Sequence, residues 1–347
     1  DQQNDTLFSA GSFVADMKGF RLKQDRKIFD VNAIRISDAS FALVKGKHDS
    51  VFTYDFIRDH FESSDTLAGQ DTIHDAPSWQ VGLSALRLRN VRFRYIDENR
   101  DPRPVGMDYQ NLDIHVNELR MHDLHILNDT FDFVMENLDC YDRCGFTVNE
   151  LSGKFRLSPL FLIADSLSIT TPNSDLDLDL AFYYQGWPSY IRFTEEVDMN
   201  AAIRPSEFNL IDAGYFAPDL LVMDNRMRIG GRVRGPVNNL RVNDFRFSFG
   251  ENTRFNGDIK LYGLPDAEET FIHTRIREFK VTQADVQQFA LPGKRRFIDV
   301  PDELVPLGNM SISGAFTGFY NDFVANAEFR TEIGTISTDV VLKQDES

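Results

Sequence analysis

The sequence predicts a mainly β protein: an elongated, curled antiparallel β-sheet that forms a groove, with a few short helices. Three observations predict this fold class. Apolar and polar residues alternate with the strand period of two through most of the 347 residues. Helical patterns are rare, and a glycine pattern recurs at a fixed offset, which is typical of repeats that stack in one direction.

The alternation places apolar side chains on one face of each strand and polar side chains on the other. It is clearest in 112–116, 175–180 and 245–249, and similar runs separated by turn residues indicate about twenty strands. In 86–95 the alternation changes phase at Asn90, which predicts a tight turn or a bulge there. We predict that the groove is lined by Leu86, Leu88, Phe93, Leu112, Ile114, Val116, Leu176, Leu178, Leu180, Phe245, Phe247, Phe249, Ile312 and Phe316.

Three segments show helical signals. Residues 51–61 carry several phenylalanines on one face, with Ser50 or Thr53 as a possible cap. Pro and Ser open a second short helix at 205–208, and Thr282 opens a third, about 78 positions further on. The polar segment 62–80 predicts a mobile loop.

The repeated pattern is Gly-x-apolar-x-Gly-x-x-Asn-x-apolar, found at 231–240 and at 314–323, an offset of 83 residues. We therefore expect successive units within one continuous elongated body. The expected units are 1–80 with the short helix and the loop, 81–215, 216–290, and 291–347 as the start of a further unit.

The composition excludes several classes of protein. The chain has 54 acidic and 37 basic residues, a net charge of -17, which disfavours nucleic acid and anionic membrane surfaces as partners. Hydrophobic residues make up 42 %, too many for a disordered chain, yet no run approaches the roughly 20 residues of a membrane-spanning helix. The chain starts at Asp1 without a signal peptide, so we expect a fragment of a longer protein.

No acid, base and nucleophile converge in the sequence, and no nucleotide-binding motif is present, so we predict no enzyme activity and no cofactor. His122 and His125 lie three apart on a strand and would face opposite sides, which does not suit one metal ion. Asp175, Asp177 and Asp179 could form a calcium ladder, but carboxylates on an exposed strand face are the commoner explanation. We therefore expect no metal site.

Cys140 and Cys144 flank three residues between two alternating runs. In a hairpin they would face each other at disulfide distance, which would imply an oxidising compartment. Two free thiols are the alternative, if the register of the loop holds them apart.

The phenylalanine-rich faces also have two interpretations. The chain has 30 Phe against 10 Tyr and 2 Trp. Such a face is usually a core packed against another sheet or a helix. The alternative is an apolar trough that the protein itself does not fill, which the scarcity of helices and the one-directional repeat favour.

Several segments follow the order and spacing of motifs from one family. Residues 4–10 together with 28–41 resemble "D-T-L-x-x-A, then I-x-x-I-x-L-x-x-x-x-F", and residues 91–97 resemble "x-F-x-Y-x-D". Residues 144–155 resemble "S-G-F-x-V-x-x-L-x-G-x-F", and residues 169–176 resemble "I-x-T-x-x-S-x-L". Residues 271–286 resemble a strand followed by "T-x-x-D-L". In this order the chain resembles the N-terminal periplasmic part of TamB proteins of the Bacteroidota, members of the AsmA-like superfamily. Cys144 departs from the serine of the family pattern.

The resemblance implies β-taco-like repeats in a translocation and assembly module, anchored to the inner membrane by an upstream segment and extending through the periplasm. It also implies a role in outer membrane biogenesis, with phospholipid transport between the two membranes. An outer-membrane assembly partner of the BamA/TamA type would bind regions outside this fragment.

The residues and the resemblance agree on one mechanism. Acyl chains of phospholipid would lie in an apolar groove, each buried CH₂ group gaining about 0.8 kcal/mol over water. The alternative is a scaffold or chaperone for outer-membrane protein assembly that accepts client strands at its sheet edges.

Overall fold

The protein is mainly β. The computed structural model describes residues 7–22, 26–49, 78–266, 269–289, 298, 300–319 and 321–343. These residues contain seventeen strands of one mostly antiparallel sheet that is not closed, together with a few short helices, so the predicted fold class is confirmed. The chain divides into two compact units, Asp1–Arg156 and Leu157–Ser347, which are described in turn.

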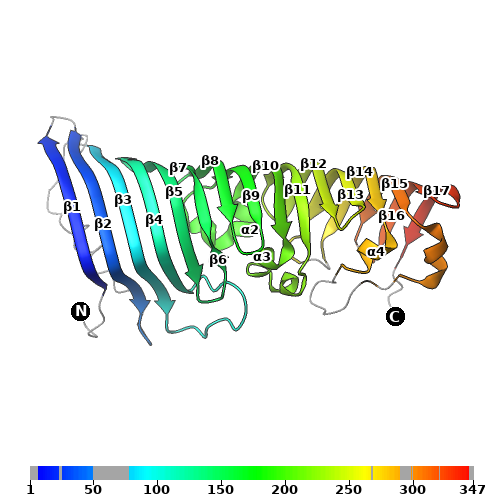
Figure 1. The fold of residues 1–347 in the computed structure, drawn as a ribbon, viewed down its shortest axis with the longest axis horizontal. Helices are drawn as coiled ribbons and strands as arrows, with labels where there is room; N and C mark the ends of the chain where they lie inside the picture. Colours follow the sequence, from blue (N-terminus) through cyan, green and yellow to red (C-terminus); the bar gives the residue numbers. More distant parts are fainter. Residues whose placement is uncertain are drawn as a thin grey trace, which may run out of the picture. The chain divides into compact units, whose positions relative to one another are not determined.

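The first unit consists mainly of long strands that lie side by side in chain order (Figure 1). Its elements are β1 (Phe8–Leu22), β2 (Arg26–Lys45), β3 (Ser78–Asp97), β4 (Asn111–Leu127), β5 (Thr130–Asp142), β6 (Thr147–Val148) and β7 (Glu150–Leu157). Each strand from β1 to β5 pairs with the next, and β6 and β7 both pair with β5.

The pair β2–β3 is parallel, with Ile34 opposite Leu86, whereas the sequence predicts antiparallel pairing throughout. Parallel neighbours need a crossover connection of a dozen or more residues. Residues 46–77 between the two strands are long enough to provide it. The predicted helix at 51–61 and most of the predicted loop at 62–80 fall outside the described residues, and β3 begins within the last three positions of that loop.

Left-handed residues interrupt the long strands. Asp38 in β2 and Asn90 in β3 have φ values of 54° and 51°, and both are missing from the ladder between these strands. The side chain of Asn90 donates a 2.6 Å hydrogen bond to Oδ1 of Asp38. Pairing resumes on either side of these two residues without a change of register, so the phase change at Asn90 is an interruption inside one continuous strand, and the predicted turn is wrong.

The second unit is an antiparallel meander in which successive strands pair from β8 to β17. Its strands are β8 (Phe161–Thr170), β9 (Asp175–Tyr183), β10 (Asp198–Asn209), β11 (Arg226–Gly235), β12 (Asn239–Phe249), β13 (Thr253–Tyr262), β14 (Phe271–Val281), β15 (Met310–Gly318), β16 (Phe323–Thr331) and β17 (Gly334–Leu342). Its short helices are η1 (Trp187–Arg192), α2 (Phe193–Glu196), α3 (Leu210–Gly214), η2 (Pro218–Val222), α4 (Gln283–Val286) and η3 (Asp302–Leu307).

The two predicted helix starts in this unit have different outcomes. Thr282 caps α4, because its side chain accepts a hydrogen bond from the amide of Asp285, so this start is confirmed. Residues 205–208 belong to β10, and α3 starts only at Leu210. Pro205 is tolerated inside this strand because the ladder is interrupted between Ile203 and Ser206, where no amide is needed for pairing.

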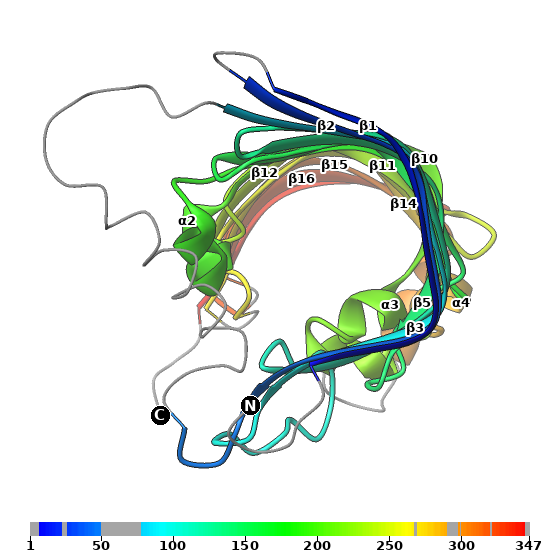
Figure 2. The ribbon, with the colours of Figure 1, turned by 90° about the vertical axis from the view of Figure 1, so that its left-hand side faces the viewer.

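The strands of the second unit bend into an arc, with α2 and α3 on its inner side (Figure 2). The best-covered apolar groups lie near these helices. Val197 is fully buried, the rings of Phe182 and Phe193 meet edge-on at 5.3 Å, and those of Tyr184 and Tyr190 lie 4.8 Å apart. The core of this unit is therefore concentrated where short helices cover one end of the strands.

The repeated glycine pattern occupies matching places in this unit. Gly231 in β11 and Gly314 in β15 both lie at interruptions of a strand, with φ values of 152° and 149°. A Cβ atom at either position would meet the backbone of the neighbouring strand. Gly235 and Gly318 end the same two strands, also at positive φ, so the sequence repeat reflects a repeated bend and turn.

Candidate ligand-binding face

A cluster of phenylalanine rings lies at the middle of the second unit. Phe247, Phe255 and Phe279 come from β12, β13 and β14 and stand opposite one another in register. The rings of Phe247 and Phe255 stack at 5.6 Å, and that of Phe279 lies 5.9 Å from Phe255. Phe245 approaches Phe255 to 5.8 Å, and Ile312 of β15 stands opposite Phe279. Cross-strand pairing thus joins four strands into one apolar surface.

This surface lies on the inner side of the arc. Leu178, Leu180 and Phe182 alternate along β9 and share one face. The ring of Phe182 contacts Phe193 of α2, the helix on the inner side of the arc in Figure 2. Leu178 stands opposite Ile203 of β10, which continues the same face toward the phenylalanine cluster. The apolar face of the second unit is therefore its concave face.

The first unit has a similar apolar face. The rings of Phe41 and Phe93 stack at 5.8 Å across the parallel pair, and Phe93 stands opposite Ile114 of β4. Leu88 pairs with Leu119, beyond the interruption in each strand, so apolar residues stay on one face despite the change in phase.

The predicted groove residues are mostly only half-buried. Of the fourteen, Phe249 is buried with 8 % exposure, and the other thirteen are intermediate. A strand face packed against a second sheet would bury its apolar side chains. The helices of the described residues are four to six residues long, which is too short to cover faces formed by strands of nine to twenty residues. The apolar faces are thus neither a closed core nor fully open to water.

Sequence reasoning missed some members of this surface. Phe255 and Phe279 complete the ring cluster but were not among the predicted groove residues. Their alternation signal is present, since Phe255 lies between Arg254 and Asn256. In β13 the signal is weakened because Gly257 takes the next inward position, and a Cβ there would meet the ring of Phe255.

The opposite face is polar and dense in ion pairs. Arg92 donates two hydrogen bonds to the carboxylate of Asp113, at 2.6 and 2.8 Å. These bonds hold the pKa of Asp113 below its usual value, against the opposing effect of its partial burial. In the second unit Arg204 pairs with Asp179 at 2.9 Å. Charge on this face is largely compensated locally.

The aspartate row of β9 is divided among separate partners. Asp179 accepts from Arg204 and from the amide of Ser166, and Asp175 accepts from the hydroxyl of Thr170. In the described part of the chain, no group of three or more His, Cys, Asp or Glu residues is arranged to hold a metal ion.

Of the two arrangements left open for the cysteines, the structure has the one in which the register of the loop holds them apart. Cys140 stands opposite Val148, and Cys144 lies in the turn itself, where its amide donates to Asp142. The hairpin closes between Asp142 and Phe146, which shifts the register. Both cysteines are free thiols in the structure. Burial, aided by two nearby aspartates, raises the pKa of Cys140 to about 11.

Two buried aspartates that the sequence analysis did not single out cap hairpin turns. Asp212 of α3 accepts from the hydroxyls of Thr171 and Ser174 in the turn between β8 and β9. Asp285 of α4 accepts from Thr253 in the turn between β12 and β13. Asp212 thus links α3, which follows β10, to the hairpin of β8 and β9. Asp285 links α4, which follows β14, to the hairpin of β12 and β13 in the same way.

Comparison with protein-family models, with curated proteins and with solved structures finds no match. No helix within the described ranges is long and apolar enough to cross a membrane. Assignment of function therefore depends on the geometry of the two faces.

Proposed function

We propose that this chain carries phospholipid acyl chains on its concave apolar face and performs no covalent chemistry. One observation carries the proposal: the apolar faces are continuous across neighbouring strands, yet thirteen of the fourteen predicted residues keep part of their surface open. An apolar surface of this kind in a chain of net charge -17 needs an apolar occupant.

The energetics suit a mobile lipid. Each CH₂ group moved from water onto the phenylalanine surface gains about 0.8 kcal/mol, so contact with eight groups gives roughly 6 kcal/mol. That is enough to hold an acyl chain in preference to water. Because apolar contacts do not recognise head groups, neighbouring positions along the face bind similarly, and a chain can slide between them.

The motif resemblance extends the proposal to a cellular setting. We place the chain in the periplasm as part of a TamB-like, AsmA-like protein, anchored to the inner membrane by a segment upstream. In that setting it would carry phospholipid between the inner and outer membranes, with an outer-membrane partner of the BamA/TamA type bound elsewhere in the protein.

The second candidate function is a scaffold for outer-membrane proteins that adds client strands to a sheet edge. The observation that favours it is β17, which pairs only with β16 among the described strands and leaves both of its faces exposed, with Val341 at 58 % and Ile336 at 55 %. An unpaired edge of this kind can template a further strand.

Substitution of the groove separates the two functions. Phe247→Asp and Phe316→Asp each place a charge on the concave face, whereas Asn243→Asp places one on the exposed polar face of β12 as a matched control. The measurement is the amount of phospholipid that co-purifies with each variant, by lipid extraction and native mass spectrometry, alongside a circular dichroism melt.

The conduit function requires that both Phe variants lose most of their bound phospholipid while the control keeps it and all three remain folded. Wild-type protein that carries no lipid, and takes up none from vesicles, would refute the conduit. A lipid load that survives in both Phe variants, together with lost binding of client strands, would support the scaffold instead.

A further inference from the structure

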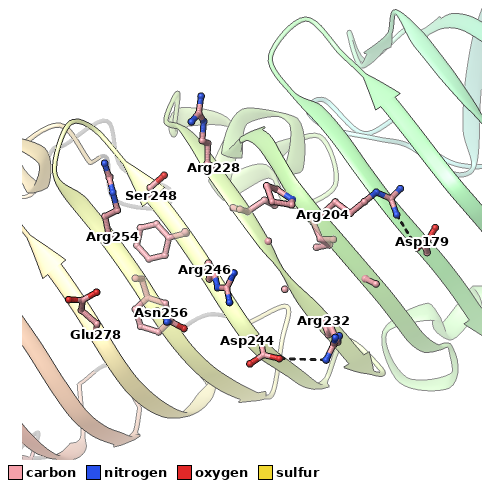
Figure 3. Close-up of a pocket in the computed structure, with 18 residues that line it drawn as sticks. Asp179, Arg204, Arg228, Arg232, Asp244, Arg246, Ser248, Arg254, Asn256 and Glu278 are labelled. Atoms are coloured by element: carbon pink, nitrogen blue, oxygen red, sulfur yellow. Dashed lines mark hydrogen bonds and ion pairs between the residues drawn. The ribbon is translucent and has the colours of Figure 1, made fainter.

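The polar face of the second unit contains a hollow with an unusual floor. It has a volume of about 650 Å³ and lies over the bends of β10, β11 and β12 (Figure 3). Gly230 and Gly231 form its floor, beside the interruption of β10 at Pro205. A Cβ at Gly230 would make ordinary van der Waals contact with the backbone of Ile203 and Pro205. Neither glycine contributes a side chain to the lining.

Arginines dominate the charged side chains around the hollow. Five line it, namely Arg204, Arg228, Arg232, Arg246 and Arg254. The acidic lining residues are only Asp179, Asp244 and Glu278, so the lining has an excess of two positive charges in a chain of net charge -17. This excess runs against the composition of the whole molecule.

The arginines differ in how they are neutralised. Arg204 pairs with Asp179 at 2.9 Å, and Arg232 pairs with Asp244 at 3.6 Å, as the dashed lines in Figure 3 mark. Arg246 makes no ion pair with any described residue, although it lies at the centre of the lining. Its guanidinium therefore keeps its full donor capacity.

Two further arginines flank this group. Ser248 of β12 stands opposite Arg228 on one side and Arg254 on the other. Neighbouring strands are about 4.8 Å apart, so the three residues form a row across β11, β12 and β13. Arg246 lies two residues before Ser248 on the same face. Among the described residues, the guanidinium of Arg254 donates to the main-chain carbonyls of Thr253 and Glu251, and Arg228 approaches Glu207 at a long 3.4 Å.

We propose that this hollow binds a phosphoryl group, with Arg246 as the principal ligand and Arg228, Arg254 and the hydroxyl of Ser248 around it. The planar guanidinium presents paired N–H donors that match two oxygens of a phosphate, and such charge-assisted bonds are stronger than neutral ones. Phe247 and Phe255 of the phenylalanine cluster also line the hollow, so the site adjoins the residues of the apolar surface, but phosphoryl binding does not depend on the lipid function. The phosphoryl group belongs either to a soluble phosphorylated molecule or to the head group of an anionic phospholipid.

The test uses the full chain and two probes. Binding of inorganic phosphate is followed by ³¹P NMR titration, and binding to vesicles of phosphatidylcholine with or without phosphatidylglycerol is followed by co-flotation. Arg246→Ala removes the principal ligand. Arg246→Lys keeps the positive charge but lacks the paired N–H donors of the guanidinium. Arg330→Ala is the control, because Arg330 is an exposed β16 arginine that already pairs with Glu328.

We expect saturable binding by the wild-type chain that Arg246→Ala weakens about tenfold, the loss that about 1.4 kcal/mol of charge-assisted bonding produces. The affinity of Arg246→Lys should lie between those of the wild type and Arg246→Ala, and the affinity of Arg330→Ala should match that of the wild type. Binding of inorganic phosphate alone identifies a soluble ligand, and Arg246-dependent flotation with phosphatidylglycerol identifies a head group. Absence of binding to either probe, or equal binding by Arg246→Ala with an unchanged melt, overturns the proposal.

Discussion

Removal of the carboxylate of Asp285 should destabilise the hairpin between β12 and β13. Asp285 is 3 % exposed and accepts four hydrogen bonds. Its donors are the amides of Glu251 at 3.2 Å, Asn252 at 3.1 Å and Thr253 at 2.8 Å, and the hydroxyl of Thr253 at 2.8 Å. Burial alone would raise the pKa of Asp285, but the Thr253 hydroxyl and these amides outweigh it and hold the pKa below the usual value.

The cost of Asp285→Ala can be worked out from these donors. Thr253 is buried, so its amide and hydroxyl lose their acceptor without replacement by water, at about 1.5 kcal/mol each. Glu251 and Asn252 are exposed, and water replaces much of what their amides lose, leaving about 0.5 kcal/mol each. The total is about 4 kcal/mol in the free energy of unfolding. Asp285→Asn keeps one acceptor oxygen but loses the charge, and should cost about half as much.

Hydrogen exchange of the turn and chemical denaturation together measure this effect. The amides of Glu251, Asn252 and Thr253 should lose protection in Asp285→Ala, and the denaturation midpoint should fall. Glu251→Ala is the matched control, since it removes an exposed side chain while its amide remains in place. An Asp285→Ala variant within about 0.5 kcal/mol of the wild type, with protected turn amides, would show that the carboxylate does not hold the hairpin.

Two further predictions concern titration and thiol reactivity. The lowered pKa of Asp113, held mainly by its hydrogen bonds from Arg92, contributes stability that is complete above the unfolded pKa of about 3.9 and is lost as the pH falls through the folded pKa. The difference in unfolding free energy between wild type and Asp113→Asn should therefore be constant near neutrality and shrink below about pH 4; a difference that grows on acidification contradicts this. Because burial raises the pKa of Cys140 to about 11, a variant with Cys144→Ser should react with a thiol reagent at pH 8 about a hundredfold more slowly than free cysteine, and a comparable rate would count against the assignment.

The strands and their faces could be predicted from sequence because alternation depends on local order alone. Leu176, Leu178 and Leu180 share a face in any register that keeps a strand, and the structure places them together. The orientation of β2 against β3 could not be predicted, because parallel and antiparallel pairs bury the same alternating residues. Phe41 meets Phe93 only through that parallel register.

The interruption of β10 and the long-range polar contacts could not be predicted from the local pattern. Pro205 resembles a helix start, yet the interruption of β10 accommodates it inside a strand. The partners of Asp285 lie 32 to 34 residues away, and nothing in the spacing identifies them. The hollow around Arg246 could not be predicted from the sequence either, because it depends on which glycines and arginines the pairing of the strands brings side by side.

The parallel pair β2–β3 sets the order in which the first unit can assemble. Strands β3, β4 and β5 follow one another closely, so each pairs with a neighbour soon after both exist. Ile34 and Leu86, in contrast, are 52 positions apart, and their ladder forms only after the intervening chain has been brought back on itself. Loop closure of that length carries an entropic cost before any contact compensates it. We expect this join to be the slowest step in folding of the unit, and until it forms the backbones of β2 and β3 remain open to other strands.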